Sequence, residues 1–271
     1  MTSPSRQAFL LGGVLFLLSA SFDATAQPNT PNFATDAWLA MGGEFKDVPG
    51  ATSPSQVKQD PRYRYVPNNT GEQPTYRIGD ISNPNLKQWV KDAMKRDNDE
   101  VLAGKYAYTA RSSCAPGGVP GFMNFGAQPI YFVQTPKETL MLFQGDQQIR
   151  RIYMDAQHTR SPKSSWYGES VGRWEGDTLV TDTIGLNNKT FLDTYRTPHS
   201  DKLHVTERWK MADHDTLDVV IRIEDPEAYN QPFSVMQRYR RVQQSYVEQV
   251  CAENNGHFFG ERIPTANKSD F

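Results

Sequence analysis

Glu207 is the first residue in this sequence whose type and setting could do chemistry. In residues 202–211, Glu207 alternates in step with the apolar residues Leu203, Val205, Trp209 and Met211. Every second residue of a strand points to the same face, so these five side chains should lie on one face. A carboxylate on an apolar face costs free energy unless it is paired or hydrogen-bonded. Glu207 is therefore either a general acid/base and ligand anchor, or half of an internal ion pair with an inward arginine.

Two further charged residues lie on predicted strands. Asp182 stands between Val180 and Ile184, where it either contacts a ligand or forms another internal ion pair. The segment 147–154 carries an arginine in each of its two rows, Arg150 and Arg151, so the sequence does not decide which row faces inward. We take Arg151 as the candidate ligand contact.

A second group of candidates lies in the segments between predicted strands. His158, Trp166 and Tyr167 occupy one such segment, and His199 and Tyr229 occupy the next two. The aromatic rings would hold a flat ligand, and His158 or His199 would carry a proton near neutral pH. Exposed histidines without any catalytic role are the alternative.

A β-meander is expected to position these residues. From residue 128 the apolar pattern has period two, which predicts strands at 128–134, 139–144, 147–154, 169–175, 178–184, 202–211, 216–223 and 233–241, with a possible last strand at 245–251. Short polar links predict antiparallel neighbours. The fold class is mainly β: an antiparallel up-and-down meander that closes into a lipocalin-like barrel, with an open sheet or sandwich as the alternative.

The lengths of the connections alternate along this meander. The links at 145–146, 176–177 and 212–215 are short, whereas those at 155–168, 185–201 and 224–232 are long. Alternate turns of a meander fall at opposite ends, so the three long loops should gather at one end. A ligand site is expected there.

An N-terminal arm at 27–127 precedes the barrel domain at 128–255, and a tail follows at 256–271. The arm contains one amphipathic helix, predicted at 84–103, with Asn83 as its cap and Gly104 at its end. The rest of the arm is polar with scattered aromatics, and we expect it to wrap the surface of the domain.

Residues 1–26 have the three parts of a secretory signal. Arg6 precedes an apolar run at 8–22, and small residues end the segment at Ala26. The run is shorter than the ~20 residues that cross a bilayer. We expect cleavage after Ala26, a periplasmic location and no stable membrane insertion.

The two cysteines, Cys114 and Cys251, form an even pair in a chain expected to reach an oxidising compartment, so a disulfide between them is predicted. The formal net charge of −2 offers no basic surface for nucleic acid. No nucleotide-binding, hydrolase or metalloprotease motif is present. We predict no cofactor and no metal.

Several blocks together resemble a large family of exported bacterial proteins of unassigned function. The most specific block is Gly-Arg-Trp-Glu-Gly-Asp-Thr-Leu-Val at 172–180, within a matching stretch at 166–180. Similar stretches lie at 83–89, 113–116, 198–208 and 225–229. The resemblance covers most of the chain and implies a hairpin at 172–180, but no reaction.

Three functions remain open at this point. The first is binding of a small hydrophobic or aromatic molecule in a barrel cavity, with Glu207 and an inward arginine at its polar part. The second is a cofactor-independent acid/base enzyme in the same cavity (a hydrolase, lyase or isomerase). The third is a structural protein of the envelope, which a filled barrel interior would indicate.

Overall fold

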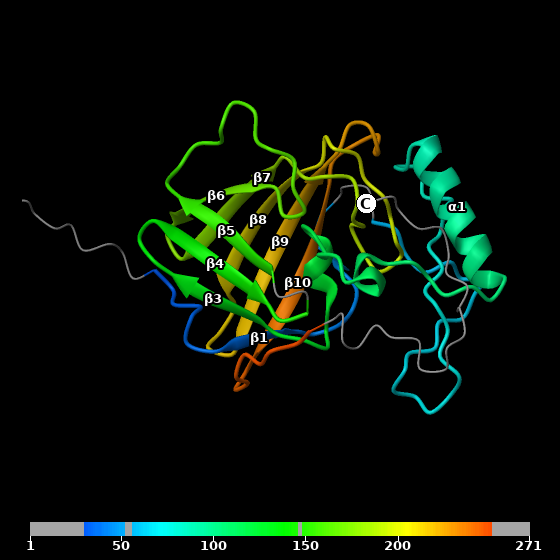
Figure 1. Cartoon of the computed structure of the whole chain (residues 1–271), viewed down its shortest axis with the longest axis horizontal. Helices are drawn as coiled ribbons and strands as arrows, with labels where there is room; N and C mark the ends of the chain where they lie inside the picture. The colour runs from blue at the N-terminus through cyan, green and yellow to red at the C-terminus, as the bar shows by residue number, and fades with distance from the viewer. Residues whose placement is uncertain (1–29, 52–55, 146–147, 251–271) are drawn as a thin grey trace, which may run out of the picture.

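The computed structural model describes residues 30–51, 56–145 and 148–250 and consists of a β-barrel with a helical arm beside it (Figure 1). The predicted signal segment, Cys251 and the tail 256–271 lie outside these ranges, so cleavage and the disulfide stay predictions. The prediction of a mainly β, lipocalin-like barrel is confirmed, because nine strands close into a ring.

The predicted strands lie close to where the period-two pattern placed them. They are β3 (Ile130–Gln134), β4 (Glu138–Phe143), β5 (Gln148–Met154), β6 (Glu169–Glu175), β7 (Thr178–Ile184), β8 (His204–Met211), β9 (Thr216–Glu224) and β10 (Phe233–Val242). The described part of the possible last strand, 245–250, forms none. Instead, β1 (Ala37–Ala40) from the arm closes the ring by pairing with β10 and β3, and β2 (Lys46–Asp47) adds to β10. The arm is therefore part of the barrel wall.

One pair of neighbouring strands departs from the predicted antiparallel order. β5 and β6 are parallel, with Ile152 opposite Ser170, while the other pairs of the ring are antiparallel. Nine strands cannot alternate in direction around a closed ring, so one parallel pair is required. The connection 155–168 consequently returns from the end of β5 to the start of β6. Its second half joins loop 185–203, as we had expected: Ser165 forms a bridge with Leu186, and the Ser165 N–H donates to Gly185 O at 3.0 Å.

Side chains fill the middle of the barrel. Phe132, Trp209 and Tyr239 stack in series, with 5.7 Å between successive ring centroids, and all three are almost fully buried. Such close contact is typical of a packed core. At this level the barrel interior is therefore occupied by side chains and is not the ligand cavity expected from the sequence.

Both ends of the barrel are plugged by the arm. At the end away from loops 185–203 and 225–232, Phe33 packs on Phe132 at 5.4 Å and on Trp174 at 5.6 Å. At the loop-rich end a 3-10 helix, η2 (Gly121–Asn124), inserts Phe122 and Met123. The Tyr239 hydroxyl donates a hydrogen bond of 3.1 Å to the carbonyl of Met123.

The α-helix, α1 (Gln88–Leu102), lies beside the loop-rich end (Figure 1). It begins four residues later than predicted because the preceding backbone bonds to loop 225–232. Leu86 forms a bridge with Tyr229, and the Lys87 N–H donates to Ala228 O at 2.9 Å. The helix ends as expected before Gly104, whose φ of 87° lies in the left-handed region.

Candidate functional site

Glu207 lies inside the barrel and is paired with Arg150. Two guanidinium nitrogens of Arg150 lie 2.9 Å from the Glu207 carboxylate oxygens. Thr181 and Trp209 donate to the same carboxylate. Arg150 also donates to two hydroxyl groups, from Nε to Ser170 Oγ at 3.2 Å and from Nη2 to Thr183 Oγ1 at 2.8 Å. A carboxylate so fully bonded and so far from solvent fits an internal ion pair.

Arg150, rather than Arg151, is the arginine that points inward. Arg150 shares its row with Ile152, which is fully buried, whereas Ile149 in the other row is 55 % exposed. Arg151 lies on the outer wall, where its Nε is 3.1 Å from Glu138 Oε2. Arg151 therefore has no access to the barrel interior.

His199 is buried next to the loop-rich end. Its Nδ1–H donates to Ser200 O at 2.8 Å, so its Nε2 accepts the hydrogen bond from the Thr190 hydroxyl, also 2.8 Å long. Burial lowers the pKa of the imidazole. His199 is thus held neutral with both ring nitrogens occupied, which suits a structural role better than proton transfer.

Asp182 and His158 meet on the outer wall of the barrel together with His204. Asp182 accepts from His158 Nε2 at 2.7 Å and from His204 Nε2 at 2.8 Å. Burial acts to raise the pKa of Asp182, but the hydrogen bonds from the two histidines outweigh it and lower the pKa to about 2. The hydrogen bond to Asp182 raises the pKa of His204. His204 was not among the candidates predicted from the sequence.

Two of the three predicted ligand-contacting rings pack against aromatic neighbours. Tyr229 is buried against Phe233 at 5.1 Å, and its hydroxyl donates to Pro198 O at 3.3 Å. Tyr167 packs edge-on against Phe122 at 5.7 Å, and Trp166 is half-buried in the connection 155–168. Tyr229 and Tyr167 thus pack against different partners, Phe233 and Phe122.

A small, mainly apolar cleft lies where the arm meets loop 185–203, and we call it the loop-end cleft. Its volume is about 300 Å³, at the lower limit of ordinary ligand pockets. Phe125 and Phe191 are its large apolar residues. The full lining is Thr109, Ala110, Gly117, Gly121, Phe125, Phe191, Asp193, Thr194 and Arg196.

Asp193 brings a carboxyl group into this cleft. Burial raises its pKa, and hydrogen bonds from Thr197 and Tyr195 oppose that shift. The Thr197 hydroxyl lies 2.7 Å from Oδ2 and the Tyr195 N–H lies 2.9 Å from Oδ1. The sequence analysis missed Asp193, although an Asp with Thr and Arg after it is a signal for a turn that aims a carboxylate at its own backbone. Nothing in the sequence alone indicates that this turn borders a cleft.

A larger polar cleft of about 670 Å³ adjoins the loop-end cleft and shares Thr109, Thr194 and Arg196 with it. Arg196 stands between the two clefts in the left-handed region, with φ 60°. It is held there by Asp97 and by the carbonyl of Arg77, at 3.2 Å. The Arg196 guanidinium is therefore held in one position between the two clefts.

The chain matches no protein-family model and no curated protein. Within the described ranges, no helix combines the length and the apolarity needed to cross a bilayer.

Proposed function

We propose that this chain is an exported, periplasmic barrel protein that binds a small apolar or aromatic molecule in the loop-end cleft. The observation that carries the proposal is a mainly apolar cleft that holds one carboxyl group, Asp193, beside a filled barrel. Apolar pockets with few polar groups are the usual form of small-molecule sites. Phe125 and Phe191 would contact the flat part of the ligand, and Asp193 would accept a hydrogen bond from its polar part.

Export is the part of this proposal that rests on sequence alone. The signal-like residues 1–26 and the resemblance at 166–180 to exported bacterial proteins support it. Fractionation of the native host, with N-terminal sequencing of the recovered protein, tests it directly. Recovery from the periplasm with Gln27 as first residue supports export, and an intact N-terminus in the cytoplasm contradicts it.

Binding is tested by fluorescence titration with the neutral aromatic probe N-phenyl-1-naphthylamine. We expect Phe191→Ala to weaken probe binding about tenfold or more, because a buried ring contributes about 1.5–3 kcal/mol. Ile149→Ala on the outer wall is the matched control and should leave binding unchanged. If the probe does not bind, or if it binds the Phe191→Ala variant as tightly as the wild type, the binding proposal is wrong. The filled barrel then favours a structural protein of the envelope.

An acid/base enzyme is the second candidate, and the raised pKa of Asp193 in a cleft favours it. Asp193 replaces Glu207, His199 and His158 as the proposed proton carrier because it lines the loop-end cleft, whereas the other three do not. Hydrolysis of p-nitrophenyl butyrate that is lost in Asp193→Asn and kept in Asp201→Asn, an exposed acid of the same loop, would favour an enzyme. Probe binding without turnover would favour the binding protein.

A further inference from the structure

A third hollow lies at the opposite end of the barrel, where β1 begins, and we call it the rim groove. β1 pairs with β10 over four residues but with β3 over only two, Ala37 and Trp38. The chain after Val242 leaves β10 at the same level. A groove of about 580 Å³ opens between these segments, within the usual range of ligand sites.

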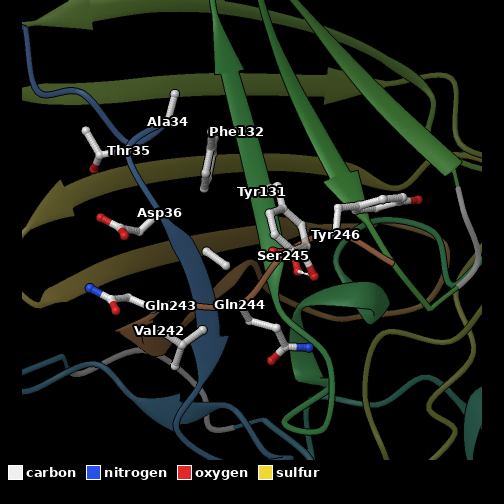
Figure 2. A pocket seen from close by; sticks show the side chains of 11 residues that line it. Ala34, Thr35, Asp36, Tyr131, Phe132, Val242, Gln243, Gln244, Ser245 and Tyr246 are labelled. Atoms are coloured by element: carbon white, nitrogen blue, oxygen red, sulfur yellow. Dashed lines mark hydrogen bonds between the residues drawn. The ribbon is translucent and has the colours of Figure 1, made fainter. Parts of the chain in front are cut away.

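Two tyrosines form one wall of the rim groove (Figure 2). The rings of Tyr131 and Tyr246 are 5.3 Å apart and meet edge-on at 74°. The Tyr131 hydroxyl donates to Ser245 O at 3.0 Å and so ties the chain after β10 to the barrel. Tyr246 is 42 % exposed. The groove therefore presents a positioned aromatic surface to solvent.

Uncharged hydrogen-bonding groups also belong to the lining of the groove. Gln243 and Gln244 are exposed, and within the described part of the chain no hydrogen bond engages their amides. Figure 2 shows Asp36 and Gln243 across the groove from Tyr131 and Tyr246. Each free amide offers an acceptor and two donors close together.

The groove carries little net charge despite the carboxylate of Asp36. Its Oδ2 lies 2.5 Å from Arg241 Nη1, and the same nitrogen bonds to Thr35 at 2.7 Å. The compensated charge disfavours a cationic ligand, and the free amides disfavour a purely apolar one. What fits is a neutral molecule with an apolar face and many hydroxyl groups.

We propose that the rim groove binds a neutral oligosaccharide. A pyranose ring has a face of C–H groups that packs on an aromatic ring, and the exposed ring of Tyr246 accepts that face. Its neighbouring hydroxyls both donate and accept, which matches the amides of Gln243 and Gln244. This site is separate from the loop-end cleft and shares no residue with it.

Isothermal titration calorimetry of the full protein with cellotetraose, maltotetraose and N-acetylchitotetraose tests the proposal. We expect at least one of these neutral saccharides to bind. Tyr246→Ala should then weaken binding about tenfold or more because the stacking surface is lost, and Tyr246→Phe should keep it. The matched control is Tyr106→Ala, since Tyr106 is a similarly exposed tyrosine in the polar cleft at the loop-rich end.

A second variant leaves the aromatic wall untouched. The double change Gln243→Ala with Gln244→Ala removes the free amides, leaves the contact between Tyr131 and Tyr246 in place, and should also weaken binding. If none of the three saccharides binds, or if both variants bind as the wild type does, the proposal is overturned. Binding of N-phenyl-1-naphthylamine should be the same in Tyr246→Ala and wild type, which keeps this result distinct from the loop-end cleft.

Discussion

Replacing Glu207 by glutamine would leave the buried guanidinium of Arg150 without its negative partner. Both side chains are almost completely buried, at 1 % and 0 % exposure. Ser170 and Thr183 would still bond to Arg150, but neither carries a charge. Breaking such a pair from one side costs about 3–5 kcal/mol. In a domain of this size that lowers Tm by about 2–4 °C for each kcal/mol, so we expect a fall of roughly 6–20 °C.

Urea unfolding followed by tryptophan fluorescence measures this change, since Trp209 donates to the Glu207 carboxylate at 3.2 Å. Adding Arg150→Met to Glu207→Gln removes the uncompensated cation, and we expect the double variant to be more stable than Glu207→Gln alone. Probe binding in the loop-end cleft should persist in any folded variant, because Glu207 does not line that cleft. A Glu207→Gln protein with wild-type stability and no probe binding would refute the structural role assigned to Glu207.

Two further predictions concern the outer wall of the barrel and the end that Phe33 closes. Asp182→Asn should lower stability at pH 7 by about 2 kcal/mol, because the folded pKa of Asp182 is lowered to about 2. A lowered carboxyl pKa stabilises the fold above the unfolded pKa, so the difference between variant and wild type should vanish as pH falls from about 5 towards 2; a difference that does not change with pH would contradict the assignment. Phe33→Ala should cost about 3–5 kcal/mol in urea unfolding, because Phe33 is fully buried between Phe132 and Trp174. A loss below about 1 kcal/mol would show that Phe33 does not close the barrel.

The sequence predicted the strands well because their signals are local. In β8 the apolar residues Val205 and Trp209 alternate with polar ones, and the turn after β6 has its Gly176-Asp177 pair in place. The row that faces inward could be predicted only where the two rows differ. In β8 they differ clearly, and Glu207 lies inside as expected. In β5 both rows contain isoleucine and arginine, and only the packed structure distinguishes Arg150 from Arg151.

The closure of the ring could not be predicted from local pattern. β1 has four residues, in a segment whose composition resembles a surface arm. It becomes a strand because β10 and β3 present unpaired edges to it, and an edge is a property of the folded sheet. The parallel β5–β6 pair follows from the same closure, since an odd ring must contain one.

The sequence by itself determined a β-barrel with one helix, the paired environment that Glu207 would need, and the signal-like segment at the N-terminus. These features follow from residue type and spacing along the chain. Only the tertiary structure decided that side chains fill the barrel and that the Asp193 carboxyl borders a cleft. It also decided that Tyr131 and Tyr246 share a groove. Those features depend on segments distant in sequence coming together, and the depth of a cavity depends on how closely both of its walls pack.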